Sequence, residues 1–95
     1  MKIDHSTIGS YIITCEDALY YVDLDLHVFC RLPRPNDVRT EQDEKYLTLY
    51  EYSDIEIGKE MSLWTKMKDS DDNEVFLEIK TKVLRINPQI DEETK

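Results

Sequence analysis

The apolar residues of this 95-residue chain recur at every second position over most of its length, and this alternation constrains the fold more than any other feature. Period two is typical of strands with one covered face, because successive side chains of a strand point to opposite sides. The β-branched and aromatic runs 11–15 and 18–22 are clear examples, and Glu16 and Asp17 separate them as a hairpin turn would. The sequence therefore predicts strands.

Further strands are predicted over 26–32, 46–52, 61–67 and 75–80, with turn residues about every ten positions. Gly58 offers the positive φ that a turn needs. Past Thr81 the apolar phase shifts, because Val83 keeps the first register whereas Leu84 and Ile86 occupy the other, which indicates a bulge or a switch between layers. We expect an all-β fold: a small antiparallel barrel, roll or sandwich of about seven short strands.

A chain of this length fits one domain, predicted over residues 1–88. Pro33 and Pro35 remove backbone donors, so a long loop is predicted near 33–45. Residues 89–95 are charged and poor in apolar side chains, which predicts a frayed acidic tail.

Two strands carry more specific expectations. In 26–32 the alternation places four residues on one face, inward in our interpretation: Leu26, Val28, Cys30 and Leu32. The segment from Val75 to Ile79 has few charges for an exposed edge strand. We therefore expect it to be central in the sheet or paired in a homodimer.

The net charge of −9 disfavours direct nucleic-acid binding, which rests on lysine and arginine displacing counterions. The same charge favours a basic protein partner, or else serves only to keep a small protein in solution. The start of the chain lacks the basic and apolar regions of a secretory signal, and no apolar run is long enough to cross a membrane. We therefore expect a cytoplasmic protein with no membrane association.

The chemistry-bearing residues form no known catalytic motif. Cys15 and Cys30 match no zinc or redox spacing and are interpreted as reduced core residues. Asp23, Asp25 and His27 are spaced by two, so an extended strand would present all three to a metal ion, but no further ligands follow at a readable spacing. No nucleophile motif or phosphate loop occurs, so we predict no enzyme and no cofactor.

A second acidic run, residues 69–73, begins like a calcium-binding EF-hand loop. The sixth position, however, is Glu74 where that loop needs glycine, and the twelfth is Lys80 where it needs glutamate. We interpret this run as a solvated turn.

Aromatic residues and acids are the remaining candidates for recognition. Between Asn36 and Glu60 the chain has eight acidic and three basic residues together with three tyrosines. Trp64 and the tyrosines either pack in the core or form an exposed patch with an acidic rim. From this region we predict a protein-binding surface made of Glu41, Asp43, Glu44, Tyr50 and Tyr52, because tyrosine beside carboxylate suits a lysine or arginine on a partner.

Several short patterns together suggest a resemblance. They are the runs 11–14 and 19–25, the Arg-Leu-Pro at 31–33, and Ile55 to Lys59 followed by Met61. The chain resembles a loose group of small uncharacterised β-rich proteins of actinobacteria and their phages. The resemblance implies a small all-β fold with no established activity, and it assigns no catalytic residue.

Three functional hypotheses follow. The first is a non-enzymatic protein-binding or assembly module, encoded by a phage or prophage. The second is an acidic inhibitor that presents carboxylates to a basic host protein where nucleic-acid phosphates would lie. The third is a metal-dependent enzyme using Asp23, Asp25 and His27. Binding by an acidic inhibitor would weaken steeply as salt rises, whereas an apolar interface would hold.

Overall fold

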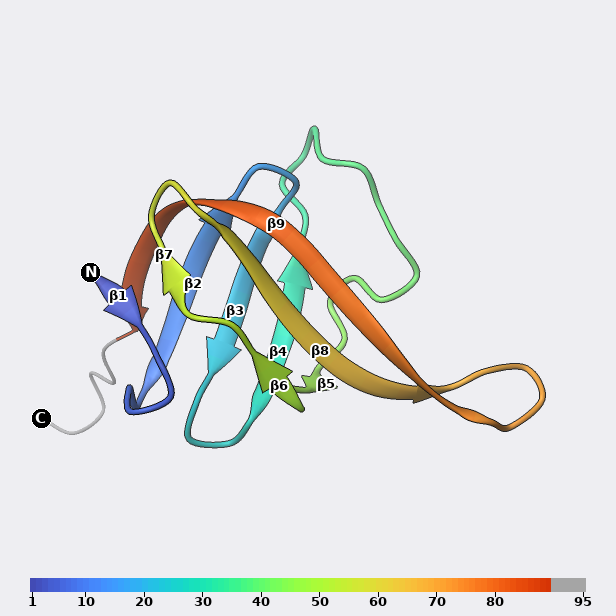
Figure 1. Ribbon diagram of the computed structural model, residues 1–95. Helices are drawn as coiled ribbons and strands as arrows, with labels where there is room; N and C mark the ends of the chain where they lie inside the picture. Colours follow the sequence, from blue (N-terminus) through green and yellow to red (C-terminus); the bar gives the residue numbers. More distant parts are fainter. Residues whose placement is uncertain (90–95) are drawn as a thin grey trace, which may run out of the picture.

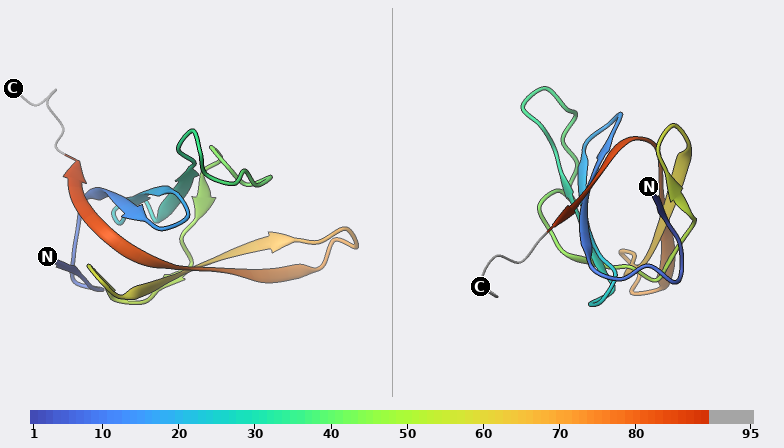
Figure 2. Two further views of the ribbon diagram at one scale, coloured as in Figure 1. Left: turned by 90° about the horizontal axis from the view of Figure 1, so that it is seen from above. Right: turned by 90° about the vertical axis from the view of Figure 1, so that its left-hand side faces the viewer.

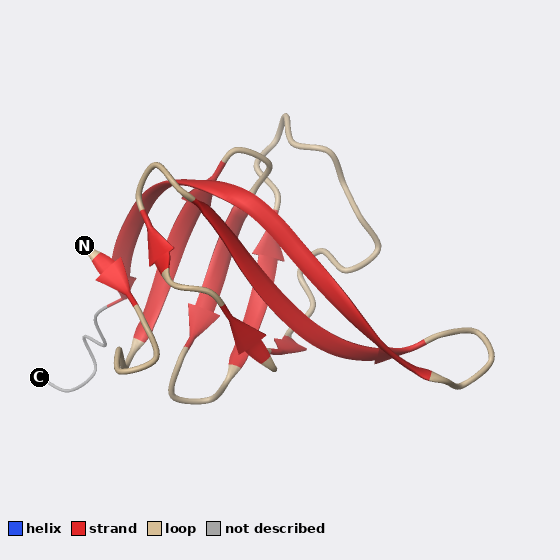
Figure 3. Ribbon diagram, viewed as in Figure 1, coloured by secondary structure: helices blue, strands red, loops and turns tan. Residues whose placement is uncertain are grey.

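A computed structural model describes residues 1–89, which form nine strands in two antiparallel sheets (Figures 1 and 3). The all-β prediction is confirmed. The strands are β1 (Lys2–Ile3), β2 (Ser10–Cys15), β3 (Leu19–Asp23), β4 (Val28–Leu32), β5 (Leu47–Thr48), β6 (Glu51–Tyr52), β7 (Ile55–Glu56), β8 (Glu60–Lys68) and β9 (Glu74–Gln89). Seven of them form a curled half-barrel sheet in the order β5-β4-β3-β2-β9-β8-β6, and β1 pairs with β7.

The predicted amino-terminal hairpin is present as β2 and β3, in which Ile13 lies opposite Tyr20. Along both strands the side chains alternate between buried and partly exposed, as the period-two pattern indicated. β3 ends at Asp23, whose Oδ1 accepts hydrogen bonds of 3.0 Å from the N–H groups of Asp25 and Leu26. These bonds give the chain an alternative to the strand ladder, so the turn into β4 begins here.

The inward face of β4 differs from the prediction. Phe29 and Arg31 are buried and lie opposite buried residues of β3. Because directly opposed residues of neighbouring strands share a face, both side chains point toward the core. Of the residues expected inward, only Cys30 is buried, and Leu26 lies in the turn before the strand.

β9 is the longest strand and joins the two halves of the sheet. Residues 74–82 pair with β8, and residues 83–89 pair with β2. The register with β2 shifts between Thr14 and Cys15, so Leu84 has no opposite residue. This bulge is the phase change that the sequence indicated, and the strand bends strongly along its length (Figure 2).

The two edge strands of the curled sheet, β5 and β6, are close in sequence, and the residues between them, Leu49 and Tyr50, form backbone hydrogen bonds at opposite ends of the sheet. The N–H of Leu49 donates to the carbonyl of His27 at one end, and the N–H of Tyr50 donates to the carbonyl of Trp64 at the other, each at 2.8 Å. The predicted strand over 46–52 is therefore divided into β5, which pairs with β4, and β6, which pairs with β8.

The core lies inside the curl of the sheet. Ile3 and Ile55, which face each other in the β1–β7 pair, are fully buried in the same cluster as the large sheet. The other buried members of the cluster are Tyr11, Ile13, Cys15, Ala18, Tyr20, Val22, Leu24, Phe29, Leu49, Tyr52, Met61, Leu63, Val83 and Ile86. The small pair therefore contributes to the core of the half-barrel.

Beyond the core, β8 and β9 project as a two-stranded ribbon, here called the arm (residues 66–76; Figure 1). Oδ1 of Asp69 closes its tip by accepting hydrogen bonds of 2.9 Å from the N–H groups of Asp71 and Asn73. The prediction that Val75–Ile79 is central in the sheet is wrong, because among residues 1–89 this part of β9 pairs only with β8. Its pairing with a second chain stays a prediction.

The structure places the long loop but not the tail. Residues 33–46 connect β4 to β5 without a strand. Gln89 belongs to β9, and the rest of the predicted acidic tail lies outside the described residues. Across residues 1–89, no helix is long and apolar enough to cross a membrane.

Candidate protein-binding surface

Asp43, one of the acids predicted to contact a partner, points into the protein. Its Oδ1 accepts a hydrogen bond from Nη1 of Arg31 at 2.7 Å, and each of these side chains is 8% exposed. Burial disfavours the charged form of Asp43, but hydrogen bonds donated by Thr40 and Arg31 outweigh burial and lower its pKa to about 2. Asp43 therefore fastens the loop to β4 and does not belong to an exposed surface.

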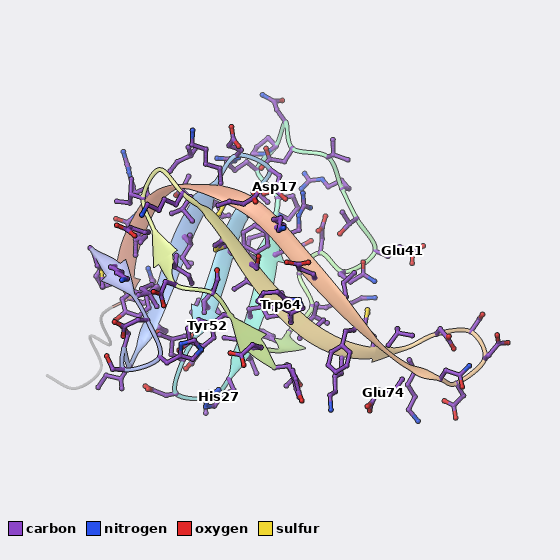
Figure 4. All side chains as sticks on the ribbon, viewed as in Figure 1. Asp17, His27, Glu41, Tyr52, Trp64 and Glu74 are labelled. Carbon is purple, nitrogen blue, oxygen red and sulfur yellow. The ribbon has the colours of Figure 1, made fainter. Side chains whose placement is uncertain are left out.

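The other predicted loop acids, Glu41 and Glu44, are exposed. Figure 4 shows Glu41 on the outer side of the loop, away from Trp64. The N–H of Glu44 donates to the carbonyl of Arg31 at 2.9 Å, so its backbone is held although its side chain is exposed.

The two tyrosines of the predicted surface are separated. Tyr52 is 8% exposed, and the ring of His5 stacks on it with ring centroids 4.6 Å apart. The hydroxyl of Tyr52 donates a hydrogen bond to the carbonyl of Asp4. Tyr50, in contrast, is 54% exposed. The expectation that both tyrosines face a partner is wrong for Tyr52, because the amino-terminal turn lies over it.

The proposed metal ligands do not form a site. Asp23 ends β3, Asp25 lies in the turn that follows, and His27 has a positive φ of 55°. The expected single strand face therefore does not exist. Oδ1 of Asp25 accepts a hydrogen bond from the N–H of Gly9. Among the described residues, no group of three His, Cys, Asp or Glu side chains could hold a metal ion.

Three aromatic residues gather on the outer face at the base of the arm, and with Lys66 they are here called the aromatic patch: Tyr50, Trp64, Lys66 and Phe76. The rings of Tyr50 and Phe76 have centroids 5.2 Å apart. Nζ of Lys66 lies 4.4 Å from the Tyr50 ring centroid and 5.5 Å from that of Phe76. Tyr50, Glu51, Trp64 and Phe76 line a shallow hollow of about 220 Å³.

The register of the arm explains why these side chains meet. Lys66 lies opposite Phe76 in the β8–β9 pair, and Trp64 lies two residues away on the same face of β8. The hydrogen bond from Tyr50 N–H to the Trp64 carbonyl brings the third ring alongside. Sequence reasoning named Tyr50 and Trp64 but missed Phe76 and Lys66. The sequence did hold a signal for Phe76, because it shares the polar face of its strand with Glu78 and Lys80. In the structure Phe76 is indeed 58% exposed.

A second cavity, of about 230 Å³, lies between β9, the long loop and the core. Leu47, Leu77 and Ile79 supply much of its wall. The charged groups at its edge bind one another, because Arg31 pairs with Asp43 and also lies 3.6 Å from Asp17. The charged side chains at this cavity are thus already paired within the chain, and we assign it no ligand.

Comparison with known proteins gives no relative for this chain. No family model, curated protein or solved structure matches it. The resemblance to actinobacterial and phage proteins therefore stays a prediction, and function has to be argued from the surface of the molecule.

Proposed function

We propose that this chain is a non-enzymatic protein-binding module and that the aromatic patch is its binding surface. The observation that carries the proposal is the exposure of two large aromatic rings, Tyr50 and Phe76, beside Trp64 at the base of a projecting arm. Clustered exposed aromatic side chains are unusual on a protein without a partner, and they are the residue type that most often anchors protein interfaces.

The chemistry around the patch favours an apolar peptide side chain with basic neighbours. The hollow accommodates an apolar group, and the ring of Tyr50 already accepts a cation, Nζ of Lys66. Two carboxylates border the hollow: Glu51 lines it and Glu78 lies opposite Trp64 in the strand pair. Both also have a partner within the chain, because Glu51 lies 2.9 Å from His5 and Glu78 lies 4.0 Å from Lys80. The net charge of −9 adds a field that attracts a basic partner.

The acids of the long loop are poorer candidates for mimicry of nucleic acid. Asp43 pairs with Arg31, and Oδ2 of Asp37 lies 2.7 Å from Nε of Arg34. Two of the four carboxylates in the loop are therefore neutralised within the chain, which leaves Glu41 and Glu44. Two separate carboxylates imitate a row of phosphates poorly, so we place recognition on the arm.

The single tryptophan of the chain, Trp64, lies in the patch and reports directly on binding. Peptides would be selected from a random displayed library and titrated against the protein while tryptophan emission is recorded. We expect enriched peptides that combine an aromatic or aliphatic residue with lysine or arginine. Phe76→Ala should weaken their binding about tenfold, the scale of one interface anchor.

Tyr46→Ala is the matched control, because Tyr46 is 70% exposed and lies outside the patch. It should bind the selected peptides like the unsubstituted protein, and both variants should keep its melting temperature. If no peptide is enriched, or if Phe76→Ala binds as tightly as Tyr46→Ala, the proposal is wrong. Affinity that falls steeply with salt and does not depend on Phe76 would instead favour the acidic inhibitor.

A further inference from the structure

Among residues 1–89, no strand pairs with one side of β9 between residues 74 and 82. Residues 74–82 pair with β8 on one side, whereas β2 reaches only residues 83–89 on the other. Backbone groups on an open edge are a template for another strand. Glu78 and Lys80 are exposed there and Phe76 is largely so, which leaves the edge accessible.

Hydrogen bonds at the two ends of the β8–β9 pair establish which backbone groups face the open side. Asp69 N–H donates to the Asn73 carbonyl, and Val83 N–H donates to the Lys59 carbonyl, so odd-numbered residues of β9 bond to β8. The carbonyl of Lys82, an even-numbered residue, points the other way and accepts from Glu16 N–H. Because strands alternate, the open edge presents the backbone groups of Glu74, Phe76, Glu78 and Lys80.

We propose that this edge binds a second copy of the same chain, antiparallel and two-fold symmetric, with Leu77 opposite Leu77 of the other copy. The four available residues are distributed evenly about Leu77. In this register Glu74 exchanges backbone hydrogen bonds with Lys80 of the other copy, and Phe76 does so with Glu78. Every free backbone group of the edge thus meets a free group on the second copy.

The side chains select the same register. With Leu77 opposite Leu77, Glu74 of each copy lies beside Lys80 of the other, and Val75 of each copy lies beside Ile79 of the other. The two adjacent symmetric registers place Glu78 opposite Glu78, or Glu74 opposite Glu78, and like charges repel at that position. A further shift toward the carboxyl end of β9 needs Lys82, whose carbonyl is already bonded. A further shift toward the tip leaves only Glu74 and Phe76 to exchange backbone hydrogen bonds.

Self-association goes beyond the proposed peptide binding and does not depend on it. A two-fold axis perpendicular to the shared sheet keeps equivalent faces on one side, so a dimer would present two aromatic patches on one continuous surface. A partner with two binding segments would then gain avidity without any new contact. Peptide titration and measurement of molar mass distinguish failure of one proposal from failure of the other.

Sedimentation equilibrium up to about 1 mM chain measures the association constant. We expect Glu74→Lys to weaken dimerisation at least about tenfold, because two lysine pairs replace two ion pairs, and Lys80→Glu to do the same. Within one chain Glu74 also lies 3.6 Å from Lys66, and Lys80 lies 4.0 Å from Glu78, so each variant should also keep the melting temperature of the unsubstituted protein. The double variant Glu74→Lys/Lys80→Glu restores opposite charges and should recover dimerisation. Asp71→Lys makes the same charge change in the tip, outside β9, and should have no effect. A monomer at every concentration, or a dimer insensitive to Glu74→Lys, overturns the proposal.

Disulfide trapping tests the register itself. Residues at the centre of a pair without mutual hydrogen bonds have Cα atoms about 4.5 Å apart, within the range of a disulfide. Leu77→Cys should therefore give a covalent dimer on mild oxidation, and both native cysteines are buried and should not compete. Glu78→Cys is the matched control, because Glu78 faces Phe76 of the other copy. Equal trapping of both variants, or none of Leu77→Cys, contradicts the register.

Discussion

Arg31 and Asp43 form an ion pair with their side chains almost wholly buried, and Nη1 of Arg31 lies 2.7 Å from Oδ1 of Asp43. Arg31 also donates to the carbonyl of Val38 at 3.0 Å and to that of Asp17 at 3.2 Å. One guanidinium on β4 therefore connects the long loop to the β2–β3 turn. The long loop, which is rich in polar residues, is therefore held in place by the buried Arg31–Asp43 ion pair and needs little apolar packing of its own.

Asp43→Asn should destabilise the protein by about 2 to 3 kcal/mol at neutral pH, because Arg31 is left buried with a weaker partner. The pKa of Asp43 is lowered to about 2, so its stabilisation is complete above the ordinary value near 4 and is lost as pH falls toward 2. Urea unfolding of both proteins at several pH values measures this difference. Glu41→Gln, on the same loop but exposed, should change stability by less than about 0.5 kcal/mol.

His5 provides a second pH-dependent contact. Its Nε2 lies 2.9 Å from Oε1 of Glu51, and this hydrogen bond raises the pKa of His5. A raised pKa means that the stabilisation is complete below the ordinary value of 6.5 and is lost as pH rises through the higher folded value. An NMR titration of the His5 ring should give a midpoint above 6.5, and Glu51→Gln should lower that midpoint. An unchanged midpoint in Glu51→Gln would show that the hydrogen bond is not formed in solution.

The thiols should be inert in the folded protein. Burial, the main cause, and the nearby Asp17 raise the pKa of Cys15 to about 12, and burial also raises that of Cys30. Since the thiolate is the reactive form, a thiol reagent at pH 8 should label neither cysteine before the protein unfolds. Labelling in buffer and in guanidinium chloride measures the difference. Rapid labelling in buffer would mean that the sheet opens locally at β2 or β4.

Local alternation predicted the strands well where each pairs with its neighbour in sequence. The β2–β3 hairpin and the bulge at Leu84 were both readable, because each depends on residues a few positions apart. The inward face of β4 was not readable. Leu26 and His27 continue the apolar and polar alternation, but they belong to the turn that Asp23 starts, and the strand begins only at Val28.

The candidate site depends on contacts between distant residues, which a period of two does not encode. Tyr50 and Tyr52 have the same local pattern, yet His5 covers only Tyr52. Phe76 likewise is exposed because it lies opposite Lys66 on the outer face of the β8–β9 pair. Sequence reasoning therefore identified the aromatic residue type of the surface but could not separate its buried members from its exposed ones.

Amide exchange along β9 should alternate in dilute solution. The N–H groups of Leu77 and Ile79 face β8 and should exchange slowly, whereas those of Phe76, Glu78 and Lys80 face the open edge and should exchange quickly. If a second copy binds as proposed, these three amides gain partners, and their protection should rise with protein concentration while that of Leu77 and Ile79 changes little. NMR exchange rates at low and high concentration, with Glu74→Lys as the control, measure both effects. Equal protection of all five amides in dilute solution would mean that another segment covers this edge, and the dimer would then have no strand to join.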